Sequence, residues 1–460
     1  MTDLSRREIL ATGAALAALA QAAPASAQSK TVPLKWNLAE LYPSAEAWEA
    51  ERAAIKQALP GLAQYKGRLG SSAQTLRAAL QAASDISKRL SRLTTYSSLQ
   101  GDEDTQQQKP RERRQEGIQL ASEVGEATAW MTPEIIKVGA TKVATFRKAD
   151  PGLGKFGFQL DNILRQAPHT LSAETEAVMA AAENPLAGAQ QIRDQLVESD
   201  IPWPEVTLAD GKKVRLDSTG YTAARQASVR TDRKKVFDSF FGEFQNFKTS
   251  LGVALSTQVQ SAIYRAKVRK YPNALAAALS NDNIPEGVYR TLVAETNKGL
   301  PVLHRYFRLR QKLLGLPDMH YYDIYPPATK SERKFTVDEA RSLTLAAVRP
   351  LGNDYVDLLA SSTAKPWADY IPRKGKASGA YMNPGAYEVH PYLLLNHTDD
   401  YDSVSTFAHE WGHAMHSMLA DRAQPYETSN YPIFIAEIAS TLNEQLLARY
   451  MQDNAKTKEE

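Results

Sequence analysis

Two histidines and a glutamate stand close together in the run His409-Glu410-Trp411-Gly412-His413. If this run is helical, His409 and His413 lie one turn apart on one face, so their imidazoles can hold one metal ion together. Glu410 is rotated by about 100° from His409, which disfavours ligation beside the two histidines. Its carboxylate can instead take a proton from a water held by the metal. The spacing therefore predicts a hydrolytic metal site with Glu410 as the general base.

A third metal ligand is expected from the apolar segment that follows Pro432. Proline suits the first turn of a helix, and Glu437 stands behind it among isoleucines and a phenylalanine. Because an unpaired carboxylate is costly in apolar surroundings, the sequence predicts that Glu437 binds the metal together with His409 and His413. The alternative for Glu437 is an ion pair with a nearby cation. Two histidines and one carboxylate leave a fourth position open, as catalytic zinc sites do.

Two further polar residues flank the expected ligands. His416 follows His413 by three residues, but its angular offset from the histidine pair favours a neighbouring role over ligation. Glu444 lies two turns beyond Glu437 on the same face of the expected helix. There it either orients a ligand or forms an exposed salt bridge.

The composition excludes several other kinds of chemistry. The chain has 460 residues and no cysteine, which rules out disulfides, thiolate nucleophiles and cysteine-bound metal clusters. Hydrophobic residues make up 43% and charged residues 23%, which is typical of globular proteins and excludes a wholly disordered chain or a polytopic membrane protein. The formal net charge of +3 gives no electrostatic reason to expect a nucleic-acid partner.

The first 27 residues have the features of an export signal. Arg6 and Arg7 precede an apolar run of about 14 residues, 9–22, which is shorter than the roughly 20 residues that span a bilayer. Residues 25–27 then supply an A-x-A cleavage pattern. We therefore expect a twin-arginine signal peptide over 1–27, a periplasmic mature protein, and no stable membrane insertion after the signal is removed.

Most of the sequence after the signal predicts helices, because apolar residues recur at spacings of three and four with few interruptions. Arg305, Arg308, Arg310 and Lys312 in one of these segments predict a solvated basic face rather than a nucleic-acid site. The expected helical segments are residues 71–99, 105–130, 230–268 and 285–315.

Strand patterns are few. Residues 206–216 predict a hairpin around the Asp210-Gly211 turn, and residues 377–396 predict a second β region. Helical periodicity gives way to the hairpin at about residue 203. We therefore expect an N-terminal helical region over 28–202 and a region over 203–460 that carries the metal ligands.

The motif that runs from His409 to His416, together with the run from Ala436 to Glu444, resembles the oligoendopeptidase F family of thimet-oligopeptidase-like zinc metallopeptidases. The resemblance extends over essentially the whole chain after residue 27. It implies a mainly α fold: a helical zincin-type body with a deep substrate channel and a small β-sheet next to the zinc helix. Other segments that carry it are Arg373-Lys374-Gly375-Lys376, Gly379-Ala380-Tyr381, residues 390–396, Tyr322-Asp323-Ile324-Tyr325 and Trp36-Asn37-Leu38.

The resemblance also implies a function. It implies one zinc ion per chain, held by His409, His413 and Glu437, and hydrolysis of internal bonds in short peptides. It further implies that the strand at 390–396 lies along the cleft and pairs with the substrate backbone. Zinc suits these ligand types best, although manganese or cobalt suits the same donors.

One departure from the family keeps other functions open. Members of the family continue beyond the glutamate-bearing helix into a segment rich in histidine and tyrosine, for which this chain has no counterpart. The catalytic region 203–460 is therefore expected to be C-terminally incomplete relative to the family. The alternatives are a metallocarboxypeptidase or dipeptidase on a similar scaffold, and a metal-binding module that binds peptides without turnover. The sequence does not indicate an oligomeric state.

Overall fold

The computed structural model describes residues 31–328 and 333–457, and its regular structure is mainly helical. The expected mainly α fold class is therefore confirmed. The signal peptide expected over 1–27 lies outside the described residues. Across the described ranges, none of the helices combines the length and the apolarity that a bilayer crossing requires.

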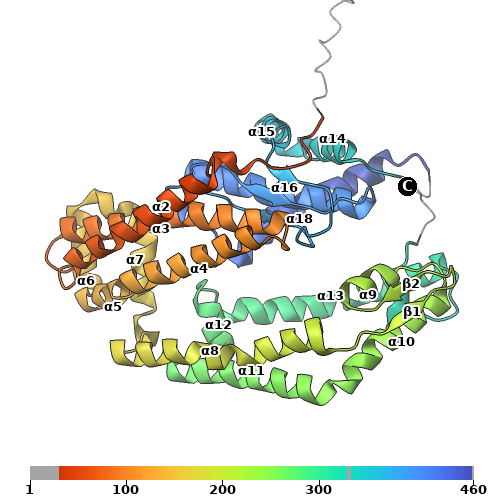
Figure 1. Cartoon of the computed structure of the whole chain (residues 1–460), viewed down its shortest axis with the longest axis horizontal. Helices are drawn as coiled ribbons and strands as arrows, with labels where there is room; N and C mark the ends of the chain where they lie inside the picture. Colours follow the sequence, from red (N-terminus) through yellow and green to blue (C-terminus); the bar gives the residue numbers. More distant parts are fainter. Residues whose placement is uncertain (1–30, 329–332, 458–460) are drawn as a thin grey trace, which may run out of the picture.

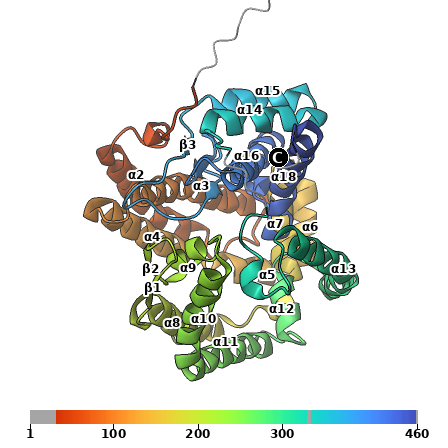
Figure 2. The same ribbon diagram turned by 90° about the vertical axis from the view of Figure 1, so that its right-hand side faces the viewer.

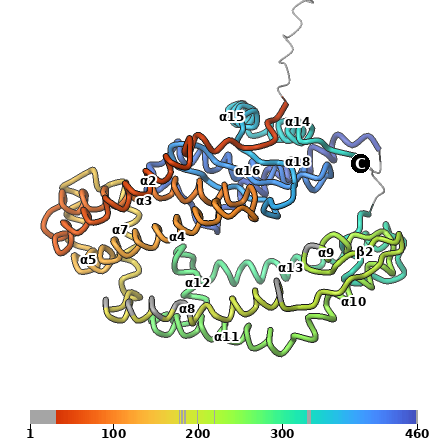
Figure 3. Tube along the Cα trace, viewed as in Figure 1, coloured from red at the N-terminus to blue at the C-terminus, as the bar shows by residue number. Residues whose placement is uncertain are grey.

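Figure 1 shows two layers of helices, which the chain visits in turn. The chain starts in the first layer, crosses to the second after α7 (Gly157–Arg165), and returns between α13 (Glu286–Leu313) and α14 (Val337–Ala347), along the path in Figure 3. The first layer also contains α2 (Ala45–Ala58), α3 (Ala73–Glu103), α4 (Gln108–Thr128), α5 (Met131–Val138), α6 (Ala140–Ala149), α15 (Asn353–Thr363), α16 (Tyr401–Ala423), α17 (Tyr426–Ser429) and α18 (Ile433–Asn454). The second layer also contains α8 (Ala173–Gln195), α9 (Ser218–Ala224), α10 (Arg230–Asn246), α11 (Lys248–Val268) and α12 (Ala274–Ser280).

The predicted helical segments are present, with one division. Residues 71–99, 105–130 and 285–315 correspond to α3, α4 and α13. The segment 230–268 forms two helices, α10 and α11, because Phe247 leaves the helical conformation with φ −103° and ψ 8°. The side chain of Phe247 packs on the apolar core of the second layer, so tertiary packing divides a segment that contains no proline.

The hairpin of the second layer forms where it was predicted. β1 (Glu205–Thr207) pairs antiparallel with β2 (Lys213–Arg215), and Val206 lies opposite Val214. Gly211 closes the turn with φ 84°, a conformation that glycine adopts without steric cost.

A three-stranded sheet in the first layer contacts α16, as the resemblance implied. It is formed by β3 (Ala368–Asp369), β4 (Tyr381–Asn383) and β5 (Tyr392–Leu394), in the order β3-β5-β4. β4 and β5 both contact α16. The expectation that the 390–396 strand pairs with substrate is wrong, because β5 is central and both of its edges are already hydrogen bonded. β3 and β4 are the edge strands, so each has one edge that the described strands leave unpaired, and β4 is the edge strand that contacts α16.

Apolar packing is unequal in the two layers. Three clusters fill the first layer, and one of them surrounds α16 through the fully buried Phe407 and Trp411. The second layer has a smaller cluster around Trp203, Val236 and Phe240 within its described residues. The elements that carry the metal motif therefore lie on the better packed layer.

The segment that carries the buried Asp323 joins α10 to α13 in the second layer, through its carboxylate on one side and its backbone oxygens on the other. Asp323 has no exposed surface and lies 2.9 Å from the guanidinium groups of both Arg230 and Arg233. Arg310 of α13 donates to the backbone oxygens of Asp323 and Pro326 and is 8% exposed. The predicted solvated face is therefore wrong for Arg310, because its guanidinium satisfies carbonyl oxygens that are buried with it.

We predict that Asp323→Ala lowers the free energy of unfolding by about 3–5 kcal/mol, because it removes the carboxylate that pairs with the buried Arg233 guanidinium. Asp238→Ala is the matched control, since it removes an exposed ion pair with Lys234 in the same layer and should cost far less. Urea unfolding followed by circular dichroism measures both. Equal losses in the two variants would contradict a structural role for the buried pair.

Candidate metal centre

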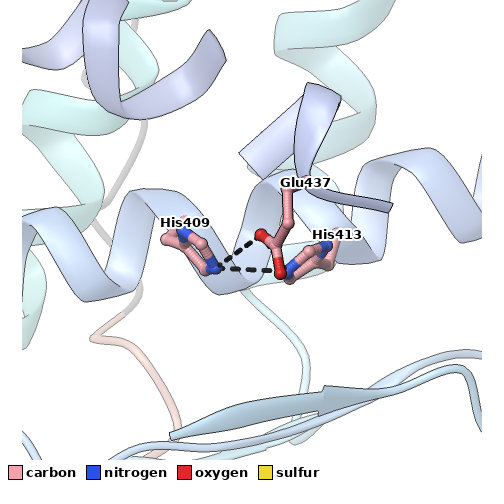
Figure 4. A group of neighbouring side chains, drawn as sticks. All are labelled: His409, His413 and Glu437. Carbon is pink, nitrogen blue, oxygen red and sulfur yellow. Dashed lines mark hydrogen bonds and ion pairs between the residues drawn. The ribbon is translucent and has the colours of Figure 1, made fainter. Parts of the chain in front are cut away.

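α16 carries both histidines of the motif on one face, as Figure 4 shows. The helix begins after Asp400, whose carboxylate accepts a hydrogen bond from the Ser403 N–H at 2.8 Å and caps the first turn. His409 and His413 stand one turn apart, with their Nε2 atoms 3.1 Å apart. Burial lowers the pKa of His413, and the neighbouring His409 lowers it further, which favours the neutral ring that binds metals.

Glu437 reaches the same point from α18. Its Oε2 atom lies 3.3 Å from Nε2 of His409 and 3.3 Å from Nε2 of His413. One ligand atom from each residue can be chosen so that all three lie within 4.8 Å of one another (Figure 4). The structure thus brings together the three residues that were predicted to bind a metal. Two imidazoles and one carboxylate fit a divalent transition metal such as zinc.

Glu437 was predicted to bind a metal because a carboxylate among apolar residues was expected to be buried, and this reason is wrong. Its side chain is 56% exposed, and the neighbouring Ile433, Phe434 and Ile438 are all more than half exposed. Glu437 is therefore not a carboxylate buried among apolar side chains. Its position is fixed instead by polar contacts, because Ser440 Oγ donates to its Oε2 at 2.8 Å and both histidines approach the same atom.

α16 and α18 cross without room for a side chain at Gly412. A Cβ at this position would lie 2.7 Å from Ser440 Cα and 2.8 Å from the Ala439 carbonyl oxygen. Next to this contact, the buried Asn443 donates to the Ala408 carbonyl at 3.1 Å and so ties the two helices together. Sequence reasoning missed these positions. The sequence feature that could have revealed Ser440 and Asn443 is their spacing. They follow Glu437 by three and six residues, which places them on the face of α18 that turns toward α16.

Glu444 holds the first histidine in place. Its Oε1 lies 2.5 Å from Nδ1 of His409, which places the ring proton on Nδ1 and leaves Nε2 to bind a metal. Of the two alternatives for Glu444, the geometry supports the orienting one. His416 lies outside the three-residue group, and its ring stacks on Tyr431 with the centroids 3.8 Å apart.

Glu410 lies beside the ligands, with its carboxylate against β4. It is 5% exposed, and the Met382 backbone N–H hydrogen bonds to it. Burial raises the pKa of Glu410 to about 7, although the neighbouring His409 lowers it in part. Its Oε2 has no hydrogen-bond partner among the described residues. A carboxyl group with such a pKa can both accept and release a proton near neutral pH.

The sheet and its loops support α16 from the other side. Trp411 is fully buried and donates its indole N–H to the Tyr370 hydroxyl at 3.0 Å. The ammonium group of Lys376 lies 2.8 Å from Asp369 Oδ1 and also donates to the backbone oxygen of Leu395, just after β5. The Arg373–Lys376 segment, which was noted only as a point of resemblance, therefore holds β3 and β5 together.

Two family models match long segments of this chain. The family model described as peptidase family M3 matches residues 223–460, and the model described as oligopeptidase F matches residues 134–202. The chain belongs to peptidase family M3. The resemblance to oligoendopeptidase F is thereby confirmed.

Individual relatives agree with this membership of family M3. Oligopeptidase PepF of Bacillus subtilis (strain 168) is 36% identical over 420 residues, which is 91% of this chain but only 62% of the relative. A solved structure from Chlamydophila abortus is 31% identical, with a TM-score of 0.80, and the match covers 94% of this chain and 73% of that one. The oligoendopeptidase-F structure from Enterococcus faecium is 26% identical, with a TM-score of 0.64, over 90% of this chain and 68% of that one.

We predict that Gly412→Ala lowers the free energy of unfolding by about 1–3 kcal/mol, because the added methyl group must push α18 away from α16. The same shift moves Glu437 away from the histidines, so zinc affinity should fall on the order of 10- to 100-fold. Urea unfolding and competition with a chromogenic zinc chelator measure the two effects.

The matched control is Gly242→Ala in α10, where a Cβ meets nothing within 4 Å. This variant should be neutral or stabilising by up to about 1 kcal/mol, because alanine is the better helix former. It should leave zinc affinity unchanged. Unaltered stability and zinc affinity in Gly412→Ala would show that the helix crossing does not set the geometry of the three donors.

Proposed function

We propose that this protein is a zinc-dependent endopeptidase that hydrolyses internal bonds of short peptides. The observation that carries the proposal is the meeting of His409, His413 and Glu437 at one point, with Glu410 buried beside them. The relatives support it, since the Bacillus subtilis protein is named an oligopeptidase and the Enterococcus faecium structure an oligoendopeptidase.

We assign one zinc ion per chain to His409, His413 and Glu437. Manganese or cobalt suits the same donors, but two imidazoles with one carboxylate favour zinc. Three protein ligands leave a position open, as a catalytic site requires. Zinc there would supply Lewis-acid chemistry, which polarises a peptide carbonyl and makes water a nucleophile at neutral pH.

The chain's own residues divide the remaining tasks. Glu410 accepts the proton of the attacking water and returns it to the leaving amine, which its raised pKa supports. Glu444 and Ser440 hold His409 and Glu437 in their orientations. Their hydrogen bonds therefore serve positioning rather than proton transfer.

We propose that an extended peptide lies along β4. This strand has one neighbour among the described strands, and its Met382 is beside Glu410. Backbone pairing at a strand edge recognises unfolded peptides with little regard to sequence. Extended, unfolded peptides therefore suit the site, whereas the deep channel that would limit their length remains a prediction.

Two other functions differ in what they produce. A metallocarboxypeptidase or dipeptidase would release terminal residues or dipeptides, whereas the proposed endopeptidase would release internal fragments. A module that binds metal and peptide without turnover is favoured by one observation, the 56% exposure of Glu437, because water weakens the electrostatics on which catalysis depends.

We predict that Glu410→Gln reduces hydrolysis of an internally quenched peptide by about 100- to 10,000-fold while one zinc per chain is retained. Glu437→Gln should lower zinc content and activity together, and removal of metal by a chelator should abolish activity. Glu205→Gln is the control, since this exposed carboxylate on β1 pairs with Lys213 in the hairpin of the second layer.

Mass spectrometry of the products separates the functions. Internal fragments support an endopeptidase, and terminal residues or dipeptides would replace the proposal by an exopeptidase. Zinc binding with no cleavage by the wild-type chain would leave the binding module. Undiminished cleavage by Glu410→Gln would contradict the role of this carboxylate.

We also propose that the protein is exported to the periplasm, on the basis of the twin arginines ahead of an apolar run. In fractionated bacterial cells the full chain should be recovered from the periplasm in a form shortened at about residue 27. Arg6→Lys combined with Arg7→Lys should hold the chain in the cytoplasm at full length. Equal periplasmic recovery of wild type and variant would contradict the twin-arginine route.

A further inference from the structure

A cavity of about 610 Å³ lies in the first layer, at the carboxyl-terminal half of α16. Residues of α3, α7, α16 and α17 line it, and Figure 2 shows α3, α7 and α16 together in that layer, above the helices of the second layer. Pockets that hold small ligands have volumes of roughly 300–1,000 Å³, so the cavity has room for a long side chain. We call it the Asp421 cavity, after a carboxylate in its lining.

The Asp421 cavity adjoins the strand edge that is proposed to bind peptides. Pro384 and Gly385, which follow β4 directly, are part of its lining. Ser417 of α16 is also in the lining, and its Oγ lies 3.9 Å from Sδ of Met382 in β4. The Met382 N–H in turn hydrogen bonds to Glu410. A peptide paired with the edge of β4 would therefore run from Glu410 toward the cavity.

The charge of the cavity lacks full compensation. Asp421 and Glu427 are both in its lining, which contains no lysine or arginine among the described residues. Glu427 has a partner, because the ammonium group of Lys155 lies 2.9 Å from its Oε1. Burial raises the pKa of Asp421, a hydrogen bond with Ser429 opposes this increase in part, and no cation in the described ranges opposes it further. A cationic ligand would supply the partner that the ionised form of Asp421 lacks.

The rest of the lining suits the guanidinium group of an arginine. Tyr387 and Tyr426 contribute aromatic rings, whose centroids lie 5.8 Å apart. Aromatic faces attract cations, and arginine is found on them more often than lysine. Serine oxygens from three helices can accept further N–H groups of a guanidinium, which has several donors. These serines are Ser84, Ser87 and Ser91 of α3, Ser417 of α16 and Ser429 of α17.

We propose that the Asp421 cavity is a specificity pocket, in which the carboxylate of Asp421 binds an arginine side chain of the substrate. This inference rests on the proposed peptidase function and adds a substrate class to it. Asp421 follows His413 by eight residues on α16, which places it about 12 Å further along the helix. An extended peptide advances about 3.3 Å per residue, so the arginine would lie within about three residues of the cleaved bond.

The test compares arginine with citrulline, which has a similar shape but no charge. In a set of short labelled peptides of alanine and glycine, one position at a time carries either arginine or citrulline. Fluorescence anisotropy measures their binding to the zinc-loaded Glu410→Gln chain, which should not cleave them. We expect arginine at one or more positions to bind about tenfold more tightly than citrulline, because a hydrogen bond between charged groups replaces a neutral one.

Variants of the lining assign this preference to the cavity. Asp421→Asn should abolish it, so that both kinds of peptide bind alike. Tyr426→Leu removes an aromatic face and should reduce the preference by about two- to fivefold, which gives a second and independent variant. Circular dichroism confirms that each variant is folded. Equal binding of arginine and citrulline peptides by the parent chain, or an unchanged preference in both variants, would overturn the proposal.

The matched control is Asp85→Asn on α3. Asp85 is an exposed carboxylate next to the lining residue Ser84, but it is not itself in the lining. Its replacement removes the same charge from the same region of the molecule and should leave the preference for arginine unchanged. A loss of preference in Asp85→Asn equal to that in Asp421→Asn would show a general effect of charge and would overturn the pocket.

Cleavage of the same peptides by the wild-type chain separates this proposal from the proposed function. Cleavage at equal rates with arginine and with citrulline would overturn the pocket and leave the peptidase. A preference for arginine in binding that Asp421→Asn abolishes, without cleavage of any peptide, would support the pocket and contradict the peptidase. Cleavage that is faster with arginine, within about three residues of it, would support both.

Discussion

The crossing of α16 and α18 sets the distance between the residues that the two helices carry. At Gly412 the backbones approach so closely that a Cβ would lie 2.7 Å from Ser440 Cα. Glu437 is one turn from that contact on α18, and His413 is next to it on α16, so the carboxylate meets the histidines without further adjustment. The contact involves backbone and small side chains, which deform little in a packed interior. The three donors thus depend on the helix crossing as much as on their own identities.

Contacts on the opposite side of α16 hold the helix in the position that the crossing requires. Trp411 is anchored to Tyr370, and the loop after β3 is tied by Lys376 to Asp369 and to the backbone after β5. A buried ammonium group is costly unless its donors are satisfied, and here a carboxylate and several carbonyl oxygens satisfy them. β4 belongs to the same sheet and contacts Glu410. The three-stranded sheet therefore positions both the proposed base and the proposed peptide-binding edge.

The sequence predicted the parts of the site whose geometry is local. His409, Glu410 and His413 lie within five residues, and helical periodicity alone places the two histidines together. Glu437 was selected because its neighbours are apolar, yet those neighbours are exposed, so the position was predicted for a reason that the structure does not bear out. The central place of β5 could not be predicted, because it depends on parallel pairing with β3 across a long connection. The burial of Arg310 was missed because its carbonyl partners come from a separate loop.

The two sides of the metal centre differ in their contact with water. Glu410 is 5% exposed, whereas Glu437, across the same group, is 56% exposed. Electrostatic interactions between charges are several times stronger where water is excluded. The exposed carboxylate of Glu437 on α18 therefore interacts less strongly with a bound metal ion than a buried carboxylate in the same position would.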